Sequence, residues 1–244
     1  MVKLKKVKYH LWAFPISKLT SSFGALVYAF AISLYILKET GSATSFALSL
    51  ICSAVPRVLV GPFAGYLADN YSRKVIVLAG QNTSIVAIGG LLIVSLMSGL
   101  SLLAIYISTV ITSIASQFSG ISLSASITRL FDESRIQRAM SLNQISVSLS
   151  SIGSPVIAGL LYRYMSMSVF LILYMATSII SVILISTMDF DLFITRKSRT
   201  DEPKESMWQS IRMGISHLRD QPIIMTMLWV VFIVNFLFDA FQIG

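Results

Sequence analysis

The sequence has a single cysteine and few charged residues. Cys52 alone cannot form an intrachain disulfide, a zinc cluster or a CxxC redox site. Of the 244 residues, 12% are charged and 55% are hydrophobic, against roughly 25% charged residues in an average soluble domain. A water-soluble core of this size could not bury that much apolar surface. The composition therefore excludes a disulfide-stapled or zinc-stapled soluble domain and indicates a membrane protein.

The sequence also lacks the residues of common enzymes and pumps. Its two histidines, His10 and His217, lie near expected membrane surfaces, and no GxxxxGK[ST] phosphate-binding loop is present. The net charge of +8 would suggest nucleic acid for a soluble chain, but the basic residues sit in short segments between apolar runs. We therefore expect no enzyme activity, no ATP-driven transport, no nucleic-acid partner, and neither a metal nor a cofactor.

Long apolar runs dominate the chain. A membrane-spanning helix needs about 20 mostly apolar residues to cross about 30 Å of hydrocarbon. We predict six complete spans and the start of a seventh, at 12–37, 43–68, 75–97, 100–127, 139–162, 167–188 and 222–244. The basic start resembles a signal peptide, but no cleavage site follows it, so the first span is predicted to be retained.

These spans predict an all-α membrane protein with three parts. They are a six-helix bundle over 1–188, a cytoplasmic linker over 189–221, and the first helix of an incomplete second bundle over 222–244. Within the linker, Trp208, Ile211, Ile215 and Leu218 recur at helical spacing. That pattern predicts either a helix on the membrane surface or a plain solvated linker helix.

The basic residues predict the orientation of the chain. If the N-terminus is cytoplasmic, 15 of the 19 basic residues fall in cytoplasmic segments, and only Lys38 and Arg163 fall on the outer side. The remaining two lie inside spans. Because basic loops stay on the inner side, the chain is predicted to be a multi-pass protein of the cell inner membrane.

The turn between the second and third spans contains a recognisable motif. Residues 61–74 read GPFAGYLADNYSRK, which resembles the G-x-L-A-D-x-x-G-R-K loop of the major facilitator superfamily. Gly61 and Gly65 are four residues apart and predict close approach of another helix. Ser72 stands where the family has its second glycine.

The charges of this loop are candidates for holding one conformation of a transporter. Asp69 closes its helix beside Arg73 and Lys74, so it can pair with Arg73 or face a neighbouring helix N-terminus. The simpler interpretation is that Arg73 and Lys74 only anchor the loop on the cytoplasmic side. Spacing, depth and position together favour the motif, with Gly65, Asp69, Arg73 and Lys74 as its working residues.

A second resemblance lies in the fifth span. Ser154, Pro155, Ala158 and Gly159 resemble the antiporter motif G-P-x-x-G-G, with Ser154 and Ala158 replacing glycines. Small residues around a proline permit close packing and a bend. The stretch 62–65 of span two is echoed at 155–159, as expected for the inverted three-helix repeats of this family. Residues 130–143 also resemble its macrolide-efflux and enterobactin-exporter branch.

Charged residues inside spans are functional candidates because they are costly in lipid. Arg57 lies about 18 Å along the helix from Asp69, near mid-membrane, whereas Lys18 is only about 9 Å in from Trp12. Lys18 can therefore either reach the interface or serve a cavity. Among the acids, only Asp239 falls within a predicted span, near its outer end. Asp239 is the candidate for proton coupling, and the alternatives are the Asp69 region or residues that this chain lacks.

Small and polar residues form stripes in three spans. The stripes run through Lys18 in span one, through Ser116 with Gln117 alongside in span four, and through Gln144 and Pro155 in span five. Tight packing and a water-filled path explain such stripes equally well. Because spans one and four line the central cavity in the superfamily, the resemblance implies substrate contact at Lys18 and Gln117. Arg57 and Gln144 are further cavity candidates.

The resemblance implies a secondary active exporter of small amphipathic molecules, such as a drug, a macrolide or a siderophore-like compound. We expect alternating access between two bundles, with protons and the lipid bilayer as further partners. The family has twelve spans and this sequence stops in the seventh, so the second six-helix bundle is missing. The alternative is a truncated, transport-inactive half. A membrane enzyme or receptor would need a titratable cluster or a large extramembrane domain, which the sequence lacks.

Overall fold

The computed structural model describes residues 2–190 and 221–243, with the side chains of 2–8, 228, 232 and 235–243 excepted. The described residues form helices and connections. The six long helices are α1 Val2–Thr40, α2 Ala43–Asn70, α3 Arg73–Ser98, α4 Leu102–Ala125, α6 Glu133–Tyr162 and α7 Met167–Thr187; the other two are the short α5 Ile127–Leu130 and α9 Pro222–Ile243. The six long helices are each apolar enough to cross a membrane, so the all-α membrane fold is confirmed.

Helix boundaries differ from the predicted spans at polar ends. α6 begins at Glu133, six residues before the predicted span, and α1 begins at Val2. A helix continues past the hydrocarbon where its sequence permits, and Glu133 in the first turn of α6 suits the positive end of the helix dipole. α4 ends at Ala125 and a separate turn of helix, α5, follows it, where a single span to 127 was predicted.

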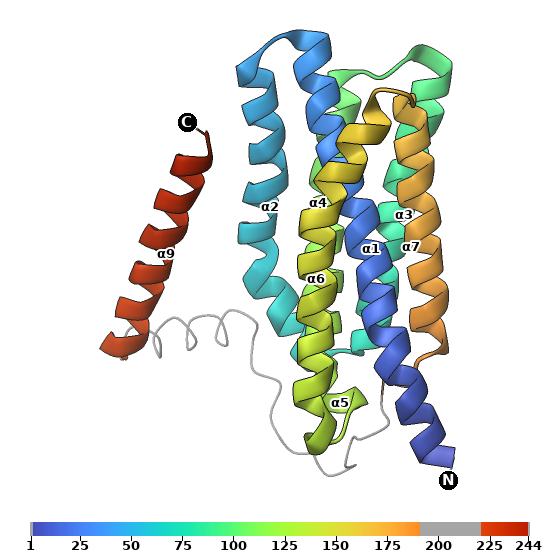
Figure 1. Ribbon diagram of the computed structural model, residues 1–244, viewed down its shortest axis with the longest axis vertical. Coiled ribbons are helices and arrows are strands. Elements are labelled where there is room, and N and C mark those ends of the chain that lie inside the picture. The colour runs from blue at the N-terminus through green and yellow to red at the C-terminus, as the bar shows by residue number, and fades with distance from the viewer. Residues whose placement is uncertain (1, 191–220, 244) are drawn as a thin grey trace. The chain divides into compact units, whose positions relative to one another are not determined.

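The six long helices stand side by side and alternate in direction (Figure 1). α1 packs against α6 and α7, α4 packs against α2 and α3, and α3 packs against α7. If α1, α2 and α3 are exchanged with α4, α6 and α7, respectively, the same set of contacting pairs results. This is the arrangement that an inverted three-helix repeat produces, and it agrees with the predicted 3+3 bundle.

The apolar core of the bundle forms two separate clusters. One contains Phe14, Leu123 and Phe131 and lies where α1 begins and α4 ends. The other contains Ile32, Ile105 and Phe170 and lies toward the opposite end. We call the first end the basic end, because Arg73, Lys74, Arg129, Arg135 and Arg138 lie on its turns and helix termini. Between the clusters is a layer rich in hydroxyl side chains, which we call the middle layer.

Serine side chains join α6 to α1 at regular intervals. Ser146, Ser150 and Ser154 lie four residues apart on α6, and their hydroxyls donate to backbone carbonyls of Pro15, Leu19 and Phe23 at 3.1, 3.5 and 3.3 Å. The donors and acceptors increase together, so the two helices run in the same direction. All three serines are buried. The stripe predicted for this span through Gln144 and Pro155 is a different face of α6, and Gln144 is exposed.

Two glycines permit the closest helix approaches among the described residues. A Cβ atom at Gly80 of α3 would lie 2.2 Å from Ser119 Oγ and 2.6 Å from the Ala115 carbonyl oxygen of α4. A Cβ atom at Gly24 of α1 would lie 1.9 Å from Thr177 Oγ1 of α7. Only a glycine fits such contacts without moving a helix, and backbone is the neighbour at Gly80. Packing of α3 on α4 therefore depends on Gly80.

The chain divides into two compact units, 1–198 and 199–244, and each is described by itself. In the second unit the described helix is α9, which lies within the range of the predicted seventh span. Asp239 lies within α9, but its side chain is outside the described atoms. The helix predicted over 208–218 lies outside the described residues, and the division at 188 and 221 stays a prediction.

Candidate functional site

Two cavities adjoin in the middle layer. The first lies among α1, α2 and α4 and also contacts Tyr174 of α7. The second lies among α1, α3, α4 and α7. They share Ala25, Ser116 and Tyr174 as lining residues, so they are neighbours within one polar region of the bundle. α1 and α2 contact each other little, which leaves room for the first cavity.

The first cavity contains Arg57. Half of its lining residues are serine or threonine, including Ser53 of α2 and Thr112 and Ser113 of α4. Arg57 is exposed rather than buried, and it is one of the lining residues of this cavity. A guanidinium beside several hydroxyls can bind a carboxylate, a sulfonate or a phosphate through parallel hydrogen bonds. Arg57 therefore lines a cavity, as its predicted role requires.

The second cavity contains Lys18. It is lined by hydroxyls such as Ser22 of α1 and Ser178 of α7, and by the side-chain amide of Gln81. Gln81 is 8% exposed. Its Nε2 donates to Ser181 Oγ at 3.1 Å, and its Oε1 has no hydrogen-bond partner among the described residues. Lys18 thus lines an internal cavity, which favours the cavity interpretation over simple reach to the interface.

Neither cation has an acidic partner among the described residues. The ion pairs found there are Arg73 with Asp69 and Arg135 with Asp132, all at the basic end. Away from the helix ends, the six long helices contain two charged residues, Lys18 and Arg57. Both carry positive charge, and each costs about 2.5–3.5 kcal/mol at the centre of a membrane helix. The middle layer therefore carries two uncompensated positive charges.

The other two cavity candidates lie elsewhere. Gln117 of α4 faces α2, and its Nε2 would lie 3.7 Å from a Cβ atom at Gly61. Gln144 is exposed on α6. Neither belongs to the lining of the two cavities. Their predicted substrate contact remains a prediction. Gln81 and Tyr174 line the cavities but were absent from the predicted set, because each lies in a span chosen only for its hydropathy.

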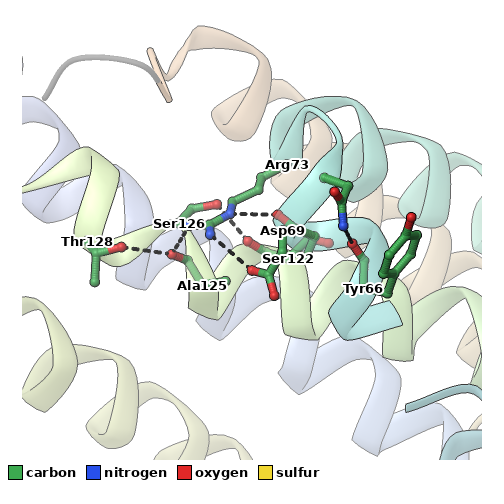
Figure 2. A network of polar contacts seen from close by, with 9 residues as sticks. Tyr66, Asp69, Arg73, Ser122, Ala125, Ser126 and Thr128 are labelled. Atoms are coloured by element: carbon green, nitrogen blue, oxygen red, sulfur yellow. Dashed lines mark hydrogen bonds and ion pairs between the residues drawn. The ribbon is translucent and has the colours of Figure 1, made fainter. Parts of the chain in front are cut away.

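At the basic end, Arg73 joins the ends of two helices. Its Nε donates to the Ala68 carbonyl of α2 at 2.9 Å, and its Nη1 donates to the Ala125 carbonyl of α4. Figure 2 shows the Arg73 guanidinium lying between Asp69 and the last turn of α4. The carbonyls at a helix C-terminus lack partners within their own helix and carry partial negative charge. Arg73 therefore satisfies the ends of α2 and α4 together.

Lys74 does the same for a third helix. Its Nζ donates to the carbonyls of Ser186 and Met188, at 2.7 and 2.8 Å, at the end of α7. The two adjacent cations at the start of α3 thus hold the ends of α2, α4 and α7. The sequence predicted positive-inside anchoring or an Asp69 pair, and neither interpretation included these carbonyl contacts, since Ala125 is 52 residues from Arg73.

Asp69 and Gly65 contribute less to this contact. Asp69 Oδ1 lies 3.5 Å from Arg73 Nη2, at the edge of hydrogen-bonding distance, and its side chain is 73% exposed. No atom of another residue lies within 4 Å of a Cβ placed on Gly65. At Gly61 the nearest atom to such a Cβ is Gln117 Nε2 of α4, at 3.7 Å. The close approach predicted at Gly61 and Gly65 therefore stays a prediction, and Ala64 and Ala68 are the buried residues of this segment. The conformational role of Asp69 stays a prediction.

A second acidic residue at the basic end is held in its charged form. The Ser134 hydroxyl donates to Asp132 Oδ2 at 2.6 Å, and Arg135 Nη1 lies 3.3 Å from Oδ1. Mainly because of the Ser134 bond, with help from Arg135, the pKa of Asp132 is below its usual value. A carboxylate that is charged at all ordinary pH values is unsuited to carry protons.

The residues of the antiporter-like motif pack against α1. Ser154 and Ala158 are fully buried, and the Ser154 hydroxyl donates to the Phe23 carbonyl. Pro155 is half-buried and Gly159 is exposed, with its nearest neighbour outside α6 at Phe30. The substitution of serine for glycine at 154 therefore adds a hydrogen bond to the helix contact. The motif's part in antiport remains a prediction.

Comparison with known proteins agrees with the fold. The chain is 27% identical over 233 residues to the uncharacterized MFS-type transporter YfiS of Bacillus subtilis (strain 168), covering 93% of this chain and 53% of that protein. It is 30% identical over 155 residues to macrolide efflux protein A of Streptococcus pyogenes, covering 63% of this chain and 37% of that protein. The chain thus spans about half the length of the curated relatives it matches.

The family model of the Major Facilitator Superfamily matches residues 16–243. This range covers the six long helices, except for the first turns of α1. It includes the loop of Asp69, Arg73 and Lys74 and the lining residues of both cavities. With six apolar helices long enough to span a membrane and this match over most of its length, the chain is a multi-pass membrane protein that belongs to the Major Facilitator Superfamily.

Proposed function

We propose that the protein exports small amphipathic molecules across the cell inner membrane by secondary active transport. The observation that supports this most is the polar middle layer, where two cavities with one cation each lie between the first and fourth long helices. A midplane site between helices is where transporters with inverted repeats bind substrate. The macrolide efflux protein among its relatives favours export as the direction.

Alternating access needs contacts that hold one state and then release. The proposed contacts are those of Arg73 and Lys74 with the ends of α2, α4 and α7, with Asp69 modulating Arg73. Bonds to exposed helix ends can break and reform with small movements, because water can replace the lost donor. The excess of basic residues at this end supports its placement on the cytoplasmic side.

Changing Asp69 to Asn tests this role. Transport should fall while membrane insertion stays near wild type, because Asp69 is exposed and contributes little to packing. The measurement is dye or antibiotic efflux from energised cells that express the gene containing this chain, with protein level read by immunoblot. Full transport by Asp69→Asn would refute the conformational role of Asp69.

We further propose that the transport is coupled to protons. Asp239 is the membrane carboxyl of the sequence, and Asp132 is unsuited because it stays charged. A protonophore should abolish efflux, and Asp239→Asn should abolish proton-driven efflux while leaving downhill exchange of substrate intact. Efflux that persists with the protonophore, but stops when sodium is removed, would show that sodium and not the proton is the coupling ion.

A second candidate is an inactive half of such a transporter. The chain spans about half the length of its curated relatives, and a path between two bundles requires both. An open reading frame with five further spans after the codon for Gly244 would favour the transporter. A stop codon there, together with no efflux from cells expressing the chain, would favour the inactive half.

A further inference from the structure

We propose that the adjoining cavities of the middle layer bind the negatively charged group of an amphipathic organic anion, through Lys18 and Arg57. This inference rests on the proposed transport function and names the class of its substrate. The two cavities share Ala25, Ser116 and Tyr174, so a ligand group held in one lies beside the other. The apolar part of such a molecule would contact apolar wall residues such as Ile32 and Leu123.

The charges around the two cavities favour an anionic ligand. Lys18 and Arg57 line the cavities, no acidic side chain lines either of them, and neither cation has an acidic partner among the described residues. A cationic ligand would meet two like charges in a medium of low dielectric constant, where repulsion is strong. An anion instead supplies the compensation that the middle layer lacks.

The uncharged walls match the same ligand class. Hydroxyls of serine and threonine can turn to donate toward an anion, and most of the polar wall residues here are serine or threonine. Gln81 adds an amide whose Oε1 has no hydrogen-bond partner among the described residues, in the cavity of Lys18.

Two dyes on one scaffold test the charge preference. Fluorescein is an anion and rhodamine 123 is a cation, and both are xanthenes of nearly equal size. Binding of each to the purified protein in nanodiscs of zwitterionic lipid is measured by fluorescence anisotropy. We expect fluorescein to bind at least ten times more tightly than rhodamine 123, and the preference to shrink at high salt. Equal or tighter binding of rhodamine 123 would overturn the inference.

Variants assign the effect to the two cations. Lys18→Gln and Arg57→Gln should each weaken fluorescein binding about tenfold, with rhodamine 123 unchanged or tighter, whereas Lys18→Arg should keep most of the affinity. Gln81→Glu tests the same charge without touching Lys18, because it places a carboxylate in the same cavity and should weaken fluorescein as much as Lys18→Gln does. Retained fluorescein affinity in all of these variants would overturn the assignment.

Efflux separates the two proposals. A protein that binds fluorescein through Lys18 and Arg57 but moves no dye refutes transport alone. One that exports rhodamine 123 and ignores fluorescein refutes the anion site alone.

Discussion

Two adjacent cations at the basic end and two cations in the middle layer make opposite kinds of contact. At the basic end, Arg73 and Lys74 donate to four backbone carbonyls on three helices. In the middle layer, Lys18 and Arg57 line cavities, and neither has an acidic partner in the part of the chain that the structure describes. Charges with fixed partners stabilise the folded bundle, while charges without partners cost stability and remain available to a ligand. The same residue types therefore indicate structure in one region and binding in the other.

The comparison predicts its largest effect for the two arginines. Arg73→Ala should lower the free energy of unfolding by about 2–4 kcal/mol, because charged donors are lost from the ends of two helices. Arg57→Ala should cause no loss, since no hydrogen bond or ion pair of Arg57 is found within 2–190 and 221–243. Reversible unfolding by SDS in mixed micelles measures both. Equal destabilisation by the two variants would break the comparison.

Gly80 lies in a helix contact that involves no charged residue, so its substitution tests packing alone. Gly80→Ala should lower the free energy of unfolding by about 1–3 kcal/mol, because the added methyl meets the Ala115 carbonyl and pushes α3 from α4. Gly90 lies on the same helix with nothing within 4 Å of an added Cβ atom, so Gly90→Ala is the matched control and should be neutral. A neutral Gly80→Ala, measured in the same micelles, would mean that the two helices are less closely packed.

The two lysines should repeat the contrast on a smaller scale. Lys74→Met removes two hydrogen bonds to the end of α7 and should lower the free energy of unfolding by about 1 kcal/mol, since these bonds are partly exposed. Lys18→Met should leave it unchanged or raise it. Thermal unfolding in detergent, followed by circular dichroism, checks both. A larger loss with Lys18→Met would point to a structural partner for Lys18.

The smallest effect is expected at Asp69. Asp69→Asn should lower the free energy of unfolding by less than about 0.5 kcal/mol, because exposed ion pairs contribute little and Asp69 is 73% exposed. The unfolding assay used for Arg73→Ala provides the value. A loss as large as that of Arg73→Ala would show that the carboxylate is needed to position the guanidinium.

The spans and the repeat could be predicted from the sequence because hydropathy and length report directly on burial in lipid. The helix ends could not, since a helix such as α6 continues through polar residues beyond the hydrocarbon. Lys18 and Arg57 were found by their cost in a membrane. The carbonyl partners of Arg73 were missed because backbone acceptors have no signature in the sequence. The approach at Gly80 was missed because its partner helix is known only after folding.

The serine contacts between α6 and α1 have one more consequence. Every turn of α1 offers an equivalent carbonyl, so sliding α6 by four residues, about 6 Å, would give each of the three hydroxyls a new acceptor. The three hydrogen bonds stabilise the contact between α6 and α1, but by themselves they do not fix the alignment of the two helices. The size of the side chains fixes the alignment of the two helices. A Cβ atom placed on Gly153 or Gly159 would lie 3.9 Å from the ring of Phe23 or Phe30, respectively. Four residues beyond Gly153 on α6 stands a larger residue, Ile157, whose side chain would face the Phe23 ring in an alignment shifted in that direction.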